Sequence, residues 1–417
     1  MSEVTNLAKA AQVASRGLAL TSTGQRNRAL LAMAAALMSD QDAILAANAE
    51  DMEAAKAKNT AASLLDRLEL NPARLKSMSE ALKALSLLPD PVGEVVGGSK
   101  MHNGIRLEQI RVPLGVVAII YEARPNVTAD AAGLCIKTGN AVILRGGSMA
   151  IKSCLALTKT LAKAAVGTGL PDDCIQSIES TEHEAAEELM GLHGLVDVLI
   201  PRGGAGLIRS CVENSKVPVI ETGVGNCHIY VHETADPKMA ERIVVNAKCQ
   251  RPGVCNAAET LLVDDEHYEK VLPPILKALE EQGVTIYGCD KTRGLGAITR
   301  INAATDEDWY AEYLDLKMAV KVVKNIDEAI RHITTYGSKH SEAIITTDYE
   351  AARQFVEAVD AAAVYVNAST RFTDGGEFGL GAEIGISTQK LHARGPMGLA
   401  ALTSTKWVGY GSGQIRE

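Results

Sequence analysis

The chain has 417 residues, and its 42 Lys and Arg against 51 Asp and Glu give a formal net charge of −9. This length allows two or three domains and a core that needs no disulfide or metal to hold it together. The acidic balance argues against nucleic acid or an anionic membrane as the main partner, because both require a basic face.

Eight cysteines invite a disulfide or metal interpretation, but their setting favours neither. The N-terminus lacks the charged-then-apolar pattern of a secretion signal, and no Cys-x-x-Cys pair or zinc-like His spacing occurs. No apolar run reaches the roughly 20 residues that span a membrane. We therefore expect a cytoplasmic protein with reduced thiols and no structural metal.

The first hundred residues predict helices, beginning with a capping box at Ser22–Gln25. After Pro91 the pattern changes to two strands, 95–96 and 105–112, around a glycine-rich turn. Because a two-stranded arm is marginally stable alone, we expect this one to pair with another subunit.

From residue 115 onward, unbroken apolar runs alternate with helical patterns, which predicts parallel sheets covered on both faces. The expected strands are 115–121, 141–144, 196–200, 217–220, 229–231, 260–263, 320–323, 343–346 and 363–366. The expected helices are 127–138, 148–166, 240–247, 268–281, 327–334 and 349–358. This alternation predicts two α/β lobes.

Cys255 is the strongest candidate for chemistry. Pro252 and Gly253 break the preceding helix, so Cys255 lies on a turn ahead of another helix or strand. A helix N-terminus and the nearby Lys248 and Arg251 would favour its thiolate. The alternative is that Cys255, like most cysteines, is a small buried apolar residue.

Two loops are candidates for anion binding, because each follows an expected strand and precedes an expected helix. One contains Arg145 with Ser148 as a helix cap, and the other contains Gly203 and Gly204. Neither matches the G-x-G-x-x-G fingerprint, so each is equally well a tight turn.

Three further polar residues end expected strands. Arg124 and Asn126 are candidates for an anionic substrate or an oxyanion; alternatively, Arg124 pairs with Glu122 and Asn126 caps the next helix. Glu221 is a candidate general base or a buried carboxylate satisfied by backbone donors. The dispersed histidines 332, 340 and 392 are interpreted as structural or surface residues.

Four separated segments, residues 113–128, 250–256, 329–342 and 378–387, resemble the gamma-glutamyl phosphate reductase family of the aldehyde dehydrogenase superfamily. The resemblance implies a cofactor-binding lobe (1–225) with a β arm near 93–113 and a catalytic lobe (226–366). It also implies a C-terminal segment (367–417) that returns to the first lobe and the arm.

The implied reaction is the reduction of L-glutamyl 5-phosphate by NADPH to L-glutamate 5-semialdehyde and phosphate, the second step of proline biosynthesis. It implies a homodimer or homotetramer in the cytoplasm and functional coupling to glutamate 5-kinase. By resemblance, Cys255 is the nucleophile, Glu221 the base position, and Arg145, Gly203, Gly204 and Glu312 bind the cofactor. Arg124, Arg251 and Lys248 are the candidates for binding the substrate's two anionic groups.

The sequence departs from the superfamily pattern at two positions. Ala123 stands where the oxyanion Asn is expected, so Asn126 is our candidate for that role, and Ile208 stands at the second glycine of the cofactor loop. Two alternatives remain: an NAD-dependent aldehyde dehydrogenase that works in the oxidative direction, and a non-catalytic binding or assembly protein that keeps the fold.

Overall fold

The computed structural model describes residues 2–416 and divides into two units. The first unit holds the chain up to Thr222, together with Gly379–Gly385 and the chain from Met397 onward. The second unit holds Gly223–Phe378 and Ile386–Pro396. The boundary expected between residues 225 and 226 therefore falls three residues after the observed junction, and the C-terminal segment is shared between the units.

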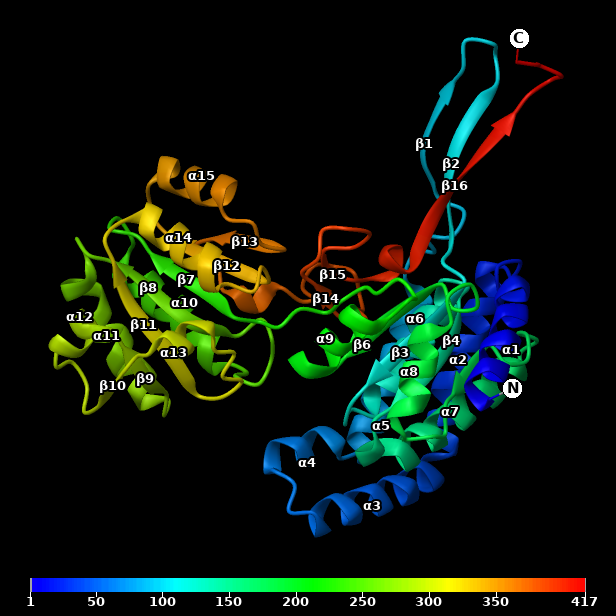
Figure 1. Cartoon of the computed structure of the whole chain (residues 1–417), viewed down its shortest axis with the longest axis horizontal. Helices are drawn as coiled ribbons and strands as arrows, with labels where there is room; N and C mark the ends of the chain where they lie inside the picture. The colour runs from blue at the N-terminus through cyan, green and yellow to red at the C-terminus, as the bar shows by residue number, and fades with distance from the viewer. Residues whose placement is uncertain (1, 417) are drawn as a thin grey trace. The chain divides into compact units, whose positions relative to one another are not determined.

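The first unit is built on a four-stranded parallel sheet in the order β5-β4-β3-β6 (Figure 1). The strands are β3 (Val116–Tyr121), β4 (Ala141–Gly146), β5 (Ile175–Ser177) and β6 (Val198–Arg202). The chain adds β4 and β5 on one side of β3 and then places β6 on the other side. Such a reversal of strand order is where open α/β sheets bind ligands, at the carboxyl ends of the strands.

Helices surround this sheet as the apolar runs predict, because β3 and β4 are buried along their whole length. The N-terminal helices are α1 (Glu3–Leu18), α2 (Thr23–Ser39), α3 (Gln41–Ala57), α4 (Ala62–Leu68) and α5 (Pro72–Leu87). The others are α6 (Asn126–Lys137), η1 (Ser148–Ala150), α7 (Ile151–Val166), α8 (His183–Gly191) and α9 (Ala205–Asn214). The strand expected over 217–220 is only a single bridge from Val219 to Leu199.

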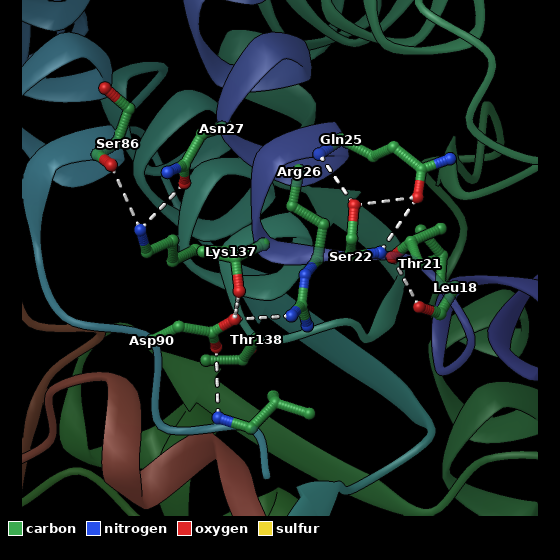
Figure 2. Close-up of polar contacts among 12 residues, drawn as sticks. Leu18, Thr21, Ser22, Gln25, Arg26, Asn27, Ser86, Asp90, Lys137 and Thr138 are labelled. Atoms are coloured by element: carbon green, nitrogen blue, oxygen red, sulfur yellow. Dashed lines mark hydrogen bonds and ion pairs between the residues drawn. The ribbon is translucent and has the colours of Figure 1, made fainter. Parts of the chain in front are cut away.

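A buried polar network joins α2 and α6 to the segment that follows α5. Figure 2 shows Lys137 Nζ donating to Asn27 Oδ1 at 2.8 Å and to the Ser86 carbonyl at 3.1 Å. Beside it, Arg26 Nη2 pairs with Asp90 Oδ2 at 2.6 Å, and both side chains are almost fully buried. Burial lowers the pKa of Arg26, although Asp90 opposes that shift.

The β arm has three strands rather than two. β1 (Val95–Lys100) pairs with β2 (Arg106–Pro113), and β2 pairs on its other side with β16 (Thr403–Tyr410), which follows η3 (Leu399–Leu402) (Figure 1). All pairs are antiparallel. The tail of the same chain therefore supplies the strand that the two-stranded arm was expected to lack.

The second unit is built on a seven-stranded parallel sheet in the order β10-β9-β11-β8-β7-β12-β13. The strands are β7 (Cys227–Val231), β8 (Ala258–Asp264), β9 (Thr285–Gly288), β10 (Ile301–Ala303), β11 (Lys317–Val323), β12 (Ser341–Ile345) and β13 (Ala363–Val366). The helices are α10 (Pro237–Cys249), α11 (Tyr268–Glu281), α12 (Asp290–Gly294), α13 (Asp306–Tyr310), α14 (Ile326–Tyr336), α15 (Tyr349–Ala358) and η2 (Thr370–Phe372). A small pair, β14 (Ile386–Ser387) with β15 (Gly395–Pro396), also belongs here.

Among residues 2–416, no single helix has both the length and the apolar composition to cross a membrane. Only α2 and α3 taken together, which meet at a bend of 67°, meet those two criteria.

Candidate active site

Cys255 lies on the turn between α10 and β8, and a glycine loop packs directly against it. The turn leads into a strand rather than a helix, so the expected helix N-terminus that would stabilise its thiolate is absent from this part of the described chain. A Cβ atom on Gly225 would lie 1.6 Å from the Cys255 carbonyl oxygen. Only glycine therefore fits at position 225 with the Cys255 turn in this position.

The Cys255 thiol faces the imidazole of His340. Nε2 of His340 lies 3.2 Å from the Cys255 sulfur, while its Nδ1 lies 2.8 Å from the Ser341 hydroxyl. Burial lowers the pKa of His340 to about 4, so the ring is neutral near pH 7. The interpretation of His340 as a structural or surface residue was thus incomplete, because it contacts the candidate nucleophile.

These groups meet at the amino ends of the strands in the second unit. Cys227 is the first residue of β7, Cys255 precedes β8 by three residues, and His340 immediately precedes β12. The Cys227 thiol donates to the Cys255 carbonyl at 3.2 Å and lies 3.7 Å from Nδ1 of His340. Parallel strands bring their starts to one edge, which explains how residues more than 80 positions apart in sequence converge.

The segment after β13 returns to the same edge and adds a guanidinium group. Asn256 holds it, since the Asn256 amide donates to the Thr373 carbonyl at 2.9 Å and its own carbonyl accepts from Thr370 Oγ1 at 2.7 Å. Arg371 between them donates from Nε to Gln250 Oε1 at 2.7 Å. Burial is the main reason that the pKa of Arg371 is lowered, and Cys255 is close enough to oppose that shift.

Arg371 was not among the residues predicted from the sequence, whereas Arg251, predicted to bind substrate, lies close to it. Arg251 is exposed and close enough to Arg371 to lower the pKa of that guanidinium further. Two neighbouring guanidinium groups, of which that of Arg371 is close to the thiol, form a local positive region in an acidic chain, as an anionic substrate requires. The sequence feature that could have indicated Arg371 is its position a few residues after the strand expected at 363–366.

Lys248 lies in the interior of the second unit. Its side chain is fully buried, and Nζ pairs with Glu259 Oε2 at 2.5 Å, while Glu259 Oε1 accepts from the Leu314 backbone at 3.2 Å. Burial raises the pKa of Glu259 to about 7 in spite of the lysine. This position does not fit the expectation that Lys248 binds substrate; its pairing instead anchors the loop on which Glu312 lies.

Glu312 holds the glycine loop against Cys255. Its Oε1 accepts from the backbone N–H of Gly225 at 2.7 Å. Asn226, the next residue, is fixed by the Ser338 hydroxyl, which accepts from its backbone N–H at 3.0 Å. These contacts place the Glu312 carboxylate beside the loop that touches the nucleophile.

In the first unit, the loop after β3 is held by its own polar groups. Glu122 Oε2 accepts from the backbone N–H of Gly204 at 3.2 Å, and Arg124 donates from its backbone N–H to the Glu122 carbonyl at 2.7 Å. Asn126 opens α6 without capping it, and its amide donates to Asp130 Oδ2 at 3.1 Å. Burial raises the pKa of Asp130 to about 6.

The two expected anion loops of the first unit differ from their prediction in detail. At Gly203, a Cβ atom would lie 2.7 Å from Glu122 Cδ, so a carboxylate lies at the start of α9 where a phosphate was expected. Arg145 is 9% exposed and donates from Nη2 to the carbonyl of Thr181 at 2.8 Å. Its Nε is buried and has no hydrogen-bond partner among the described residues, and Ser148 makes no helix cap.

Glu221 is half-buried and is the residue before Thr222, where the first stretch of the first unit ends.

The eight cysteines all lie in the described chain as reduced thiols. Within residues 2–416, no group of three His, Cys, Asp or Glu side chains is arranged to hold a metal ion.

Known proteins that are similar to this chain belong to one enzyme family. The family model described as "Aldehyde dehydrogenase family" matches residues 1–312. The gamma-glutamyl phosphate reductase of Moorella thermoacetica is 59% identical over 415 residues, covering 100% of this chain and 99% of its own. The solved gamma-glutamyl phosphate reductase of Thermotoga maritima is 47% identical, with a TM-score of 0.97 and 100% of both chains covered.

An acetylating aldehyde dehydrogenase from Geobacillus thermoglucosidasius has the same fold at 19% identity, with a TM-score of 0.70 over 100% of this chain and 98% of its own. The first two relatives are so similar in sequence, over the whole chain, that they share the family with this chain and not only the fold. The chain therefore belongs to the aldehyde dehydrogenase family, with its parallel-sheet α/β fold, and is an oxidoreductase of the gamma-glutamyl phosphate reductase group.

Proposed function

We propose that this protein reduces L-glutamyl 5-phosphate to L-glutamate 5-semialdehyde and phosphate with NADPH, by way of a thioester on Cys255. The observation that carries the mechanism is the Cys255 sulfur, 3.2 Å from an imidazole nitrogen and close to the Arg371 guanidinium. The relatives that are named for this reaction and match the whole chain support the choice of substrate.

The chemistry required of Cys255 is nucleophilic. Its sulfur attacks the acyl carbon, the bond from that carbon to the phosphate oxygen breaks, and phosphate leaves. In this proposal, the backbone N–H of Cys255 and the Asn126 amide donate to the oxyanion; the Asn126 NH₂ group has two donors, of which one is directed to Asp130. Arg124, Arg251 and Arg371 are the groups proposed to bind the substrate's phosphate and α-carboxylate.

The residues of the first unit fit a dinucleotide in part. Glu122 at the reversal of strand order offers a carboxylate to a ribose hydroxyl, and the buried Nε of Arg145 offers a donor that lacks a partner among the described residues. Gly203, Gly204 and Glu312 complete the proposed set. When bound, the reduced nicotinamide supplies the hydride that the thioester accepts.

Glu221 has a smaller role in this proposal than a base would have in an oxidative aldehyde dehydrogenase. An acyl phosphate is already activated, so no water has to be deprotonated, and water attack on the thioester would waste the substrate. We expect Glu221→Ala to retain much more activity than Cys255→Ala.

The β arm is proposed to join subunits into a homodimer or homotetramer in the cytoplasm. Val95, Trp407 and Tyr410 of this arm are 56%, 61% and 51% exposed, and exposed apolar side chains gathered on one element mark interaction surfaces. Functional coupling to the kinase that makes the unstable acyl phosphate belongs to the same proposal.

The test runs the reaction in reverse, measuring NADP⁺ reduction with glutamate semialdehyde and phosphate. We expect activity to require phosphate, to prefer NADP⁺ over NAD⁺, and to fall at least about 10³-fold in Cys255→Ser. Phosphate-independent oxidation would favour the oxidative aldehyde dehydrogenase instead. Activity of Cys255→Ser near that of the wild type would overturn the covalent mechanism.

A further inference from the structure

We propose that His340 is the catalytic base that removes the proton from the Cys255 thiol. The inference deepens the proposed function, because it concerns the same nucleophile. It starts from the 3.2 Å contact between His340 Nε2 and the Cys255 sulfur, which is within reach for a proton transfer between nitrogen and sulfur.

The surroundings of the other ring nitrogen assign the tautomer. Ser341, which lies 2.8 Å from Nδ1, donates its single hydroxyl proton to Thr373 Oγ1 at 2.6 Å. Cys227, the other neighbour of Nδ1, donates its proton to the Cys255 carbonyl. Both neighbours can therefore only accept from Nδ1, so the ring proton is on Nδ1. Nε2 then presents a lone pair to the Cys255 S–H group.

The environment keeps this imidazole neutral until it is used. His340 is fully buried, and burial lowers its pKa to about 4. The titratable or charged groups around the pair are the Cys227 thiol of β7, the Tyr365 hydroxyl of β13, the Glu342 carboxyl of β12 and the Arg371 guanidinium of η2. Arg251 and Asp374 lie close to that guanidinium, and the Glu259 carboxyl of β8 acts on Cys227. Burial raises the pKa of both Cys227 and Tyr365, so neither competes with Cys255 as the proton donor.

The proton balance of the acylation step is complete with these groups. As the Cys255 sulfur forms its bond to the acyl carbon, the thiol proton moves to His340 Nε2, and the carbon–oxygen bond to phosphate breaks. Nε2 then returns its proton to the departing phosphate, which leaves as hydrogen phosphate. The thioester and a neutral imidazole remain, and no electron is transferred in this step.

The experiment measures alkylation of Cys255 by iodoacetamide between pH 5.5 and 9.5, with Cys255 followed by peptide mass spectrometry. In the full-length wild type, we expect the rate to change little from pH 6 to pH 8. In His340→Gln, which keeps a hydrogen-bonding side chain of similar size, we expect the rate to fall about tenfold per pH unit below about 8.5, where free cysteine ionises. The two rates should converge near pH 9.5.

His332→Gln is the matched control, because His332 is also buried in the second unit and packs against Trp309 and Tyr336 rather than Cys255. It should keep the wild-type profile. Ser341→Ala supplies a second variant that leaves both histidines in place. It removes the hydroxyl that accepts from Nδ1, so the ring proton can move to Nε2 and alkylation at pH 6.5 should be slower.

Thermal melting of each variant separates misfolding from loss of the base. A folded His340→Gln whose profile overlays the wild type would refute the proposal. Alkylation requires neither substrate nor NADPH. If the profile depends on His340 but the protein has no reductase activity, the proposed function is wrong and the role of His340 as the base for Cys255 still holds.

Discussion

The loops at the edges of the two parallel sheets carry similar residue types but use them differently. At the carboxyl edge of the first unit's sheet, Glu122 accepts from the backbone of Gly204 and Arg145 donates to a backbone carbonyl, so both charged groups have backbone partners. At the amino edge of the second unit's sheet, the Cys255 thiol faces a neutral imidazole. The difference teaches that the position of a side chain at a strand end does not define its role, and that its contacts in the fold have to be known as well.

The largest effect is expected from filling the space beneath Cys255. In Gly225→Ala, the new Cβ atom would overlap the Cys255 carbonyl oxygen, so the turn must move. Displacing a catalytic group by about 1 Å can cost 10²-fold in rate; we expect at least that loss in kcat/KM, together with a lower melting temperature. Gly294→Ala in the same unit is the control, since a Cβ atom there would meet no other described segment within 4 Å. Unchanged kinetics in Gly225→Ala would mean that the loop does not position Cys255.

The next effect compares buried ion pairs of the two units. Glu259→Gln leaves the fully buried Lys248 without its anion, and breaking such a pair typically costs about 3–5 kcal/mol. Asp90→Asn does the same to Arg26 in the first unit (Figure 2). Because the Lys248 pair also holds the Glu312 loop, only Glu259→Gln should lower the rate of Cys255 alkylation as well.

Denaturant unfolding and alkylation measure the two consequences separately. Glu50→Gln, which breaks the exposed pair with Lys152, should change the free energy of unfolding by less than about 1 kcal/mol. Equal alkylation rates in Glu259→Gln and Asp90→Asn would show that the Lys248–Glu259 pair does not position Cys255.

Much of the fold follows from the sequence, because long apolar and amphipathic runs dominate it. The helices at Tyr268–Glu281 and Tyr349–Ala358 have the predicted bounds. The short strands β5, β9 and β10 were not predicted, since three or four residues carry too little periodicity. The third strand of the arm comes from a tail whose pairing partner is about 300 residues away, which no local pattern reveals.

The candidate site was found only in part for a related reason. Ligands of α/β sheets usually bind at the carboxyl ends of strands, and this rule led to Arg124, Asn126, Arg145 and Gly204. His340 precedes its strand, outside the reach of this rule, and its interpretation as a structural or surface residue came from the dispersed spacing of the histidines. The burial of Lys248 could not be seen either, because its partner Glu259 lies in the next strand and not on the same helix.

Acid should affect the site around Cys255 through His340. The pKa of His340 is lowered in the fold to about 4 from an ordinary value near 6.5, so the unfolded chain binds more protons between these values. Its contribution to stability is therefore complete above about pH 6.5 and is lost as the pH falls toward 4, by up to about 3 kcal/mol.

Melting the wild type and His340→Gln from pH 7 to pH 4 isolates this contribution. We expect the wild type to lose more stability than the variant over that range. Asp130 of the first unit, whose pKa is raised to about 6, titrates in the same window with the opposite sign and is present in both proteins, so it cancels in the difference. Parallel curves would show that His340 titrates normally.

The smallest effect is expected at the start of α9, and it sharpens the contrast between the two edges. Glu122→Gln removes a carboxylate that accepts from Gly204 near a helix N-terminus, a contact worth about 0.3–1 kcal/mol. Stability should therefore fall by less than about 1 kcal/mol, and the alkylation rate of Cys255 should stay unchanged. If Glu122 binds a ribose hydroxyl, the Kd for NADP⁺ should rise severalfold; if it only blocks a phosphate from the α9 backbone, the Kd should fall. Calorimetric titration distinguishes the two, and an unchanged Kd would assign Glu122 to the fold alone.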